Sequence, residues 1–220
     1  MAVTNRTISI VLKVLRNELK GLPEPSVTLV GKKWKDPFHV LISCILSLRT
    51  KDTVTLPASE RLFALADSSA EMLKLSSKQI EKVIYPVGFY KRKAKTIFDI
   101  CQRLEKEFDG KVPDDLEVLL TFKGVGRKTA NLVLTEGFNK PAVCVDTHVH
   151  RISNRIGYVK TKTPNETEKV LRHKLPKRHW IEYNALLVAW GQNICHPISP
   201  LCSYCKIRQF CARVGVKNSR

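Results

Sequence analysis

The segment 121–151 combines a glycine pair, a lysine and a carboxylate, residue types that can bind phosphate and act on a sugar. Gly124 and Gly126 precede a run, 127–134, whose composition favours a helix. Glycines let the backbone turn tightly, and the free amides of a helix start attract anions. A glycine pair alone is more often an ordinary turn. Because no strand is expected before it and no Gly-Lys-Ser/Thr follows, the pattern excludes a dinucleotide fingerprint and a Walker loop, and nucleic-acid phosphate is the expected anion.

Lys128 and Asp146 are the candidate catalytic residues. Lys128 lies on the first turn of the expected helix, where the helix dipole and neighbouring Arg127 disfavour the ammonium and so favour a nucleophilic amine. Asp146 could accept or relay a proton, or stabilise a cationic sugar. The residues alone leave two other roles equally open: Lys128 as a phosphate contact, and Asp146 as the cap of a helix over 147–154.

Four cysteines lie close together near the C-terminus, with the spacing Cys195-x6-Cys202-x2-Cys205-x5-Cys211. Such a group in an intracellular protein predicts a metal site and argues against disulfides. Four thiolates suit either a structural zinc ion or a cubane iron–sulfur cluster, and spacing alone leaves both open. The other three cysteines, Cys44, Cys101 and Cys144, stand in apolar sequence and are expected in the core.

The bulk composition predicts a polyanionic partner. The 220 residues carry 38 Lys and Arg against 20 Asp and Glu, a net charge of +18. Charge of this size on a globular chain favours nucleic acid. No apolar run is long enough to span a membrane, and no signal peptide is recognisable, so we expect an intracellular protein of the cytoplasm or nucleoid. We also expect it to act as a monomer.

The two motifs together resemble a known family. Gly-Val-Gly-Arg-Lys-Thr-Ala-Asn, then Val-Asp-Thr-His-Val-x-Arg, and the 6-2-5 cysteine spacing are similar to the helix-hairpin-helix DNA glycosylases, specifically the endonuclease III family. The resemblance covers nearly the whole chain. It implies that Lys128 attacks the sugar C1′ while Asp146 assists, and that Cys195, Cys202, Cys205 and Cys211 hold a [4Fe-4S] cluster.

The same resemblance implies an activity and a partner. The activity is a bifunctional DNA glycosylase and AP lyase for base excision repair, and its partner is double-stranded DNA with damaged bases or abasic sites. Oxidised pyrimidines such as thymine glycol are the expected lesions, with cleavage 3′ to the abasic site by β-elimination. Two alternatives are a monofunctional mismatch (uracil or thymine) DNA glycosylase and a non-catalytic damaged-DNA-binding protein. Mismatch relatives lack the hairpin lysine, so Lys128 favours the bifunctional enzyme.

DNA contacts are expected from several further residues. Phe89 or Tyr90 could enter the base stack, with Lys91 and Arg92 beside them on phosphates. The resemblance places an intercalating apolar residue in this Gly-x-Tyr loop, which implies Phe89 as the wedge and Tyr90 as packing. Arg49 stands where the family usually has a glutamine that probes the space left by the flipped base, which leaves the preferred lesion and opposite base open. The remaining expected phosphate contacts are Gly124, Gly126, Arg127, Lys91, Lys206 and Arg208.

The expected fold is all-α in two lobes. One is a six-helix bundle over 27–139 that contains the hairpin; the other joins 1–26 to 140–220 and carries the iron–sulfur loop. Phe38 to Leu48, opened by Asp36-Pro37, predicts a central buried helix. Residues 22–35 contain two prolines and a glycine and predict an irregular crossing. The other predicted helices cover 7–19, 53–65 (bent or interrupted near Pro57), 70–75, 78–84, 93–108, 163–175 and 179–192.

Overall fold

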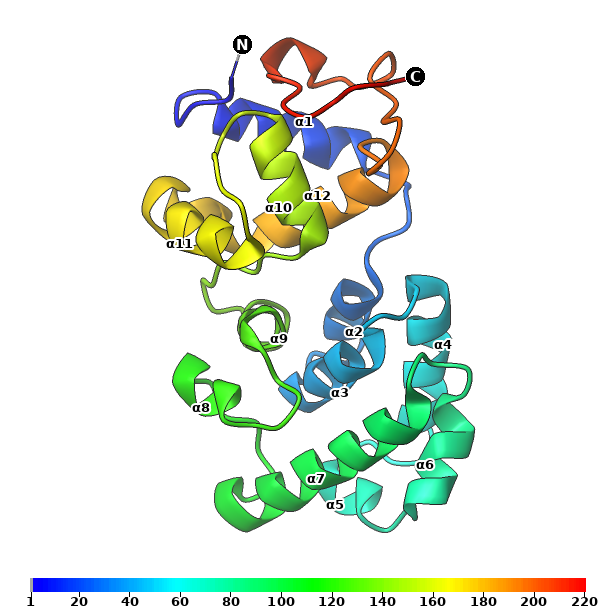
Figure 1. The fold of residues 1–220 in the computed structure, drawn as a ribbon. Helices are drawn as coiled ribbons and strands as arrows, with labels where there is room; N and C mark the ends of the chain where they lie inside the picture. The colour runs from blue at the N-terminus through cyan, green and yellow to red at the C-terminus, as the bar shows by residue number, and fades with distance from the viewer. Residues whose placement is uncertain (1) are drawn as a thin grey trace. The chain divides into compact units, whose positions relative to one another are not determined.

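The structure, a computed structural model, describes residues 2–220, and within them the regular elements are helices without strands (Figure 1). The all-α fold class expected from the sequence is confirmed. Among the described residues, every helix is too short or too polar to cross a bilayer.

The chain divides into two compact units. Unit 1 consists of Met1–Glu24 and Val143–Arg220, and unit 2 of Pro25–Ala142. Unit 1 contains α1 (Ile8–Glu18), α10 (Thr147–Arg155), α11 (Pro164–Lys174), α12 (Trp180–Asn193) and the 3-10 turns η2 (Lys177–His179) and η3 (Arg208–Phe210). Unit 2 contains α2 (Ser26–Trp34), α3 (Pro37–Ser47), α4 (Asp52–Phe63), α5 (Ser69–Met72), α6 (Ser77–Ile84), α7 (Tyr90–Phe108), α8 (Leu116–Leu120), α9 (Arg127–Leu132) and the π-helical turn η1 (Val133–Gly137).

Helix α3 is the central helix of unit 2, as its apolar sequence predicted. Asp36 caps it by accepting a hydrogen bond from the backbone N–H of His39 (3.3 Å), and Pro37 occupies the first helical position. Every residue from Phe38 to Leu46 is buried. The helix packs against α2, α4, α7, α9 and η1, so it supports both the second helix of the hairpin and α7 (Figure 1).

Residues 22–35 do not form the irregular crossing that we expected. Helix α2 runs through Ser26–Trp34 because both prolines precede it, with Pro25 as its N-cap residue. Gly31 lies inside the helix where it meets η1: a Cβ there would be only 2.9 Å from the backbone oxygen of Glu136. This glycine therefore allows a close helix contact and does not end the helix.

Helix α4 is not interrupted near Pro57, since it continues through this residue. A proline removes one helical hydrogen bond, but the following residues Ala58 and Leu62 are completely buried and hold the helix in place. Burial of Ala58 and Leu62 therefore outweighs the tendency of proline to break a helix.

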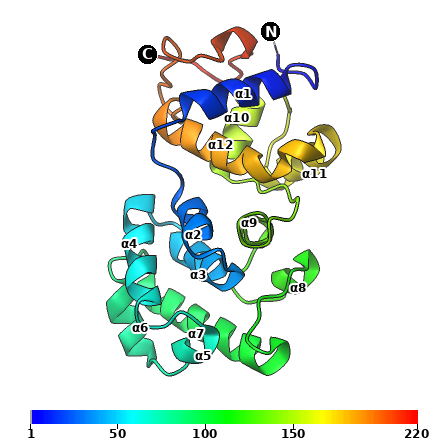
Figure 2. The ribbon, with the colours of Figure 1, turned by 180° about the vertical axis from the view of Figure 1, so that it is seen from behind.

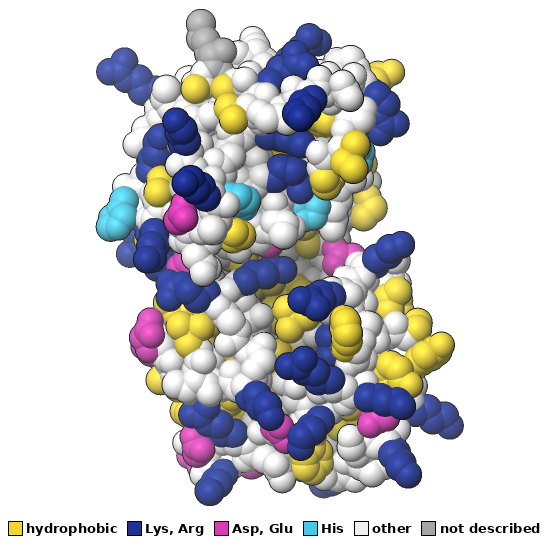
Figure 3. All heavy atoms as spheres, viewed as in Figure 1, with side chains coloured by type: hydrophobic (Ala, Val, Ile, Leu, Met, Phe, Trp, Pro, Cys, Tyr) yellow, Lys and Arg dark blue, Asp and Glu magenta, His cyan; other side chains and the backbone are white. Residues whose placement is uncertain are grey.

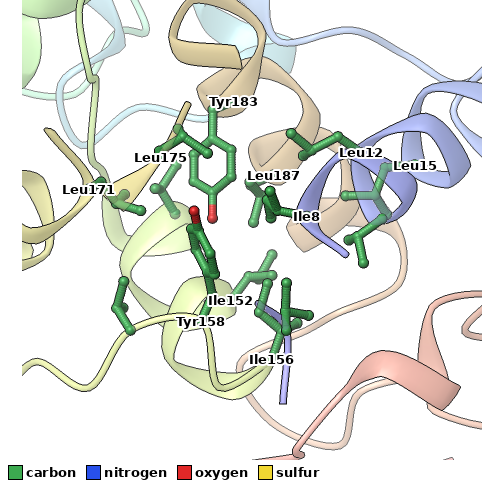
Figure 4. Close-up of a cluster of buried hydrophobic side chains, with 14 of the residues drawn as sticks. Ile8, Leu12, Leu15, Ile152, Ile156, Tyr158, Leu171, Leu175, Tyr183 and Leu187 are labelled. Atoms are coloured by element: carbon green, nitrogen blue, oxygen red, sulfur yellow. The ribbon is translucent and has the colours of Figure 1, made fainter. Parts of the chain in front are cut away.

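Unit 1 has its own hydrophobic core, to which both ends of the chain contribute. The apolar face of α1 packs on α10 and α12, which the opposite views of Figures 1 and 2 both show. Figure 4 shows Ile8, Leu12 and Leu15 facing Leu187 and Ile152. The buried tyrosines Tyr158 and Tyr183 lie on the other side of this core, with Leu171 and Leu175 beside them (Figure 4). The core supports the start of α10, where Asp146 lies.

Candidate active site and nucleic-acid interface

The glycine pair forms the turn of a helix–hairpin–helix. Asp115 caps α8 by accepting from the backbone N–H of Val118 (3.0 Å), and α9 begins at Arg127, directly after Gly126. Gly124 has a φ of +85°, in the left-handed region that favours glycine. The turn therefore has the local structure expected from its sequence.

The two glycines have different surroundings. A Cβ on Gly124 would be 2.9 Å from the Cγ2 atom of Thr96, and its φ is also unfavourable for alanine. Gly126 has an ordinary φ of −99°, and a Cβ there would meet no atom of the protein within 4 Å. The backbone at Gly126 is thus open on the side from which a ligand could approach.

This difference predicts separate effects of two matched substitutions. Gly124→Ala is expected to lower the free energy of unfolding by about 1–3 kcal/mol, because it adds both steric contact and backbone strain. Gly126→Ala is expected to leave stability near wild type and to weaken DNA binding, because its methyl group occupies the open approach to the helix amides. Thermal unfolding and duplex binding measured on both variants check this; unchanged binding by Gly126→Ala would remove this residue from the interface.

Lys128 lies on the first turn of α9 and is exposed. It is near enough to Cys44 of α3 for its charge to act on that buried thiol. Burial raises the pKa of Cys44 to about 12, and the positive charge of Lys128 opposes this rise. An exposed amine at the start of a helix, next to a phosphate-binding turn, can meet a substrate.

Three of the predicted DNA contacts line one pocket in unit 2. Arg49, Phe89 and Gly124 surround a cavity of about 350 Å³, whose other lining residues are Ile45, Leu48, Arg92, Lys93, Thr96 and Lys123. The guanidinium carbon of Arg49 is 5.9 Å from the centre of the Phe89 ring. An apolar cavity with a cationic rim and an exposed aromatic ring suits a nucleobase and its phosphates.

The other predicted contacts of unit 2 lie outside this pocket. Lys91 is exposed near the start of α7, and Arg127 is partly exposed at the start of α9. Tyr90, which we expected to pack, is partly buried against Tyr85 with ring centres 5.4 Å apart. Figure 3 shows Lys and Arg side chains over the visible face, with few acidic ones among them. This charge distribution favours phosphate binding.

Two basic residues of the pocket were missed by the sequence interpretation: Lys93 and Lys123. Lys93 is buried with 6% exposure, and its burial lowers the pKa of its ammonium to about 8. A signal was present in the sequence, because Lys93 occupies the same helical face as Ile97, Ile100 and Leu104. A lysine on an apolar stripe predicts a buried amine with a specific set of acceptors.

Asp146 in unit 1 caps helix α10. Its carboxylate accepts a hydrogen bond from the backbone N–H of Val149 (2.8 Å), which is the capping role that its sequence left open. The side chain is partly exposed, so one carboxylate can cap the helix and still reach a substrate. The buried run Val143 to Val145 precedes it and fixes where the helix starts.

Two arginines of the same helix hold the segment around the first cysteine. Arg151 donates to the backbone oxygen of Cys195 (2.8 Å), and Arg155 donates to those of His196 and Pro197 (2.6 Å each). Arg155 also approaches the sulfur of Cys195 at 3.4 Å. The sequence interpretation missed both residues, because no local pattern links them to a cysteine some 40 positions away.

The four clustered cysteines line one common pocket in unit 1 together with Arg155 and Arg213. Burial raises the pKa of the Cys205 thiol to about 11, so a bound metal would be needed to hold it as a thiolate at neutral pH. N–H groups of Arg155 and Arg213 lie 3.4 Å from the sulfurs of Cys195 and Cys211 and would stabilise negative sulfur. Within residues 2–220, no three acidic, histidine or cysteine side chains are grouped closely enough to hold a single metal ion.

Lys206 and Arg208 are exposed in the loop between the third and fourth cysteines. Ile207 between them is buried in the core of unit 1. The loop is therefore anchored by its apolar residue while its two charges face solvent, as phosphate contacts require.

Comparison with protein families matches residues 42–177 to the HhH-GPD superfamily base excision DNA repair proteins. This range contains the second half of the central helix α3, the hairpin, Lys128 and Asp146. The cysteine loop follows it.

Individual relatives agree with this match. Endonuclease III of Thermotoga maritima is 48% identical over 179 residues, which cover 81% of this chain and 84% of the relative. The chloroplastic endonuclease III homolog 2 of Arabidopsis thaliana is 44% identical over 79% of this chain, and the match spans about half (47%) of that longer relative. The solved structure of a trapped endonuclease III–DNA covalent intermediate aligns with a TM-score of 0.83 and 29% identity, covering 96% of this chain and 97% of the other.

Proposed function

The chain belongs to the HhH-GPD superfamily of base excision DNA repair proteins, and from this membership we propose that it is a bifunctional DNA glycosylase and AP lyase of the endonuclease III type. Its partner is damaged double-stranded DNA. The observation that carries the proposal is the exposed lysine on the first turn after the hairpin, in a chain similar to an enzyme trapped covalently on DNA. Likeness to bacterial endonuclease III supports a place in the cytoplasm or nucleoid, where we propose that it acts as a monomer.

The proposed reaction begins with Lys128. Its neutral amine attacks C1′ of the damaged nucleotide, the bond from C1′ to the base breaks, and the base leaves with a proton. The amine gives one proton to the departing base. The C1′–O4′ bond of the sugar ring then breaks, O4′ takes up a proton, and Nζ, which keeps one hydrogen, forms a protonated Schiff base with C1′. The positive charge of the Schiff base makes the C2′ proton more acidic. When a base removes this proton, the C3′–O bond breaks and the 3′ phosphate leaves by β-elimination. Water then hydrolyses the Schiff base and frees Lys128.

Asp146 is proposed to assist the first step. Its carboxylate would stabilise the cationic sugar as the base leaves, or take a proton from the attacking amine. The hydrogen bond from the Val149 amide fixes the orientation of the carboxylate. Capping and catalysis would thus use the same side chain.

The damaged nucleotide must leave the base stack before a side chain can reach its C1′. We propose that Phe89 enters the stack and that Arg49 fills part of the space left behind, with Lys91, Gly126 and Arg127 on phosphates. The exposure of Phe89 (63%) and its contact with Arg49 support this role. Lys206 and Arg208 would bind phosphate from the cysteine loop. Oxidised pyrimidines such as thymine glycol are the proposed lesions.

The four cysteines are proposed to hold a [4Fe-4S] cluster. They line one pocket, N–H groups approach two of the sulfurs, and their spacing matches the family pattern. When bound, such a cluster would supply metal–thiolate bonds that join the segments carrying the four thiols. No step of base removal is assigned to it; Ile207 and the two arginines of α10 hold this region to the rest of unit 1.

Loss of one cysteine ligand is expected to remove both iron and stability. Cys205→Ser should abolish visible absorbance and bound iron and sulfide, and should lower the free energy of unfolding by about 4 kcal/mol or more. Cys101→Ala is the matched control, because Cys101 is a buried core residue of unit 2. It should retain all its iron. Zinc with no sulfide in the wild-type protein would show that the site is mononuclear.

The proposed activity is tested by borohydride trapping on a duplex containing one thymine glycol, beside an undamaged duplex. A covalent band on the damaged duplex alone would demonstrate both an amine nucleophile and lesion recognition. Base release without trapping, and with cutting only in alkali, would indicate the monofunctional glycosylase. Tight binding with neither reaction, on this duplex and on one with an abasic site, would indicate a non-catalytic DNA-binding protein.

A further inference from the structure

Lys93 makes an unusual set of contacts for a lysine. Its Nζ atom is surrounded by three oxygen atoms: the backbone oxygens of Leu46 (2.8 Å) and Leu48 (2.5 Å) and the hydroxyl of Thr50 (3.0 Å). An ammonium has three N–H donors, so each can reach one acceptor. These acceptors lie in the last turn of α3 and in the turn that follows it. The lysine therefore satisfies carbonyls at a helix C-terminus, where a positive charge is favourable.

The turn held by Lys93 contacts a second turn, the one before α7. The Thr50 hydroxyl, which Lys93 approaches, also accepts a hydrogen bond from the backbone N–H of Gly88 (3.2 Å). The two backbones are so close that a Cβ on Gly88 would lie 2.9 Å from the oxygen of Arg49. One buried amine and one hydroxyl thus join the turn that carries Arg49 to the turn that carries Phe89.

Both turns hold their exposed residue in an unfavourable backbone conformation. Arg49 has a φ of +52° and Phe89 a φ of +58°, in the left-handed region that costs a residue other than glycine roughly 1–2 kcal/mol. Such strain persists only where surrounding contacts fix the backbone. Lys93, Thr50 and Gly88 supply contacts that fix these two turns.

The strained residues are exposed on the surface that Lys93 supports from inside. Phe89 is 63% exposed and lies beside Arg49 at the edge of the apolar pocket, and Lys93 lines the same pocket. Inserting two side chains into DNA costs less free energy if their backbone is already ordered. A buried ammonium with a complete set of acceptors supplies that order.

We propose that Lys93 is a positioning residue that holds the Arg49 turn and the Phe89 turn together as one preformed probe of the opened base stack. The inference rests on the proposed function, since it assigns Lys93 a role in entering duplex DNA. It gives Lys93 no part in the covalent chemistry. Reactions that need the stack to be opened depend on Lys93, and reactions that do not need it are independent of Lys93.

The test compares two substrates with the variant Lys93→Met, which keeps the length of the side chain and loses its donors. On a thymine glycol duplex, single-turnover base release should fall on the order of 10- to 100-fold, because the probe is misplaced. On a single-stranded oligonucleotide with one abasic site, which has no stack to open, strand cutting should stay near the wild-type rate. Lys95→Met is the matched control: Lys95 is exposed on the same helix, and both of its rates should stay near wild type.

A second measurement separates positioning from a purely structural role. In a background with Arg49→Ala and Phe89→Ala, the change Lys93→Met should add little further loss on the duplex, because the residues it positions are gone. An equally large loss in that background would overturn the proposal. So would equal losses on the duplex and on the single strand, or no loss on either.

Thr50→Val provides a second route if Lys93→Met does not fold. It removes the hydroxyl that joins the two turns and leaves the bonds from Lys93 to Leu46 and Leu48. The same selective loss on the duplex is expected. Wild-type protein that is not trapped on the thymine glycol duplex and cuts no abasic site, in duplex or single strand, would contradict the proposed function itself. Wild-type rates on both substrates for Lys93→Met and Thr50→Val would contradict only the role of Lys93.

Discussion

Replacement of Lys128 by glutamine is expected to abolish covalent trapping and to lower strand cutting by at least about 10,000-fold. Glutamine has a similar length and can still donate a hydrogen bond, but its amide nitrogen is not a nucleophile and cannot form a Schiff base. Since Lys128 is exposed, the change should leave the free energy of unfolding near wild type. Affinity for a lesion duplex should fall only slightly, because one positive charge of many is lost.

Lys106→Gln is the matched control for this prediction. Lys106 is exposed in the last turn of α7 and does not line the pocket beside Gly124. Its replacement by glutamine makes the same change in net charge. Trapping and cutting by this variant should equal those of the wild type at the same salt concentration. If Lys128→Gln were trapped or cut abasic DNA as the wild type does, the nucleophile would have to be another amine.

Replacement of Asp146 by asparagine is expected to separate its two roles. Asparagine retains an oxygen that can accept from the Val149 amide, so the cap of α10 and the stability of the protein should persist. The negative charge is lost, and base release should slow by about 100- to 10,000-fold. Asp146→Ala should show the same kinetic loss and, in addition, lower the free energy of unfolding by about 1 kcal/mol.

Asp115→Asn is the corresponding control, because Asp115 caps α8 through the same kind of bond, to the Val118 amide. It should change neither stability nor base release appreciably. Denaturant unfolding and single-turnover kinetics on the three variants provide the measurements. A normal rate for Asp146→Asn together with a slow, unstable Asp146→Ala would assign Asp146 to capping alone.

The sequence predicted those parts of the fold that depend on local patterns. The helix after Asp36-Pro37 and the cap at Asp146 follow from short-range rules, and both are present. Residues 22–35 were misinterpreted because prolines and a glycine were taken to break structure. In the folded protein Pro25 starts α2, and Gly31 allows the close contact with η1, which is a tertiary cause that no local window contains.

In the candidate site, too, local sequence patterns predicted some residues, whereas tertiary contacts alone reveal the others. Lys128, Asp146 and the four cysteines could be recognised because their motifs are contiguous or closely spaced. The residues that support them could not, because their partners lie far along the chain. Lys93 bonds residues more than 40 positions away, and Arg155 reaches the cysteine segment over a similar separation. Spatial proximity of this kind arises only from the packing of whole helices.

The division of unit 1 between the two ends of the chain has a consequence for synthesis on the ribosome. Residues 25–142 are contiguous, so unit 2 can fold while the rest is still being made. Helix α1 emerges before unit 2, yet most of its packing partners lie in Val143–Arg220. The apolar side chains of Ile8, Leu12 and Leu15 therefore lack most of their packing partners while unit 2 is translated. During that interval the nascent chain exposes these apolar side chains to solvent, where they are open to wrong association until residues 143–220 are made.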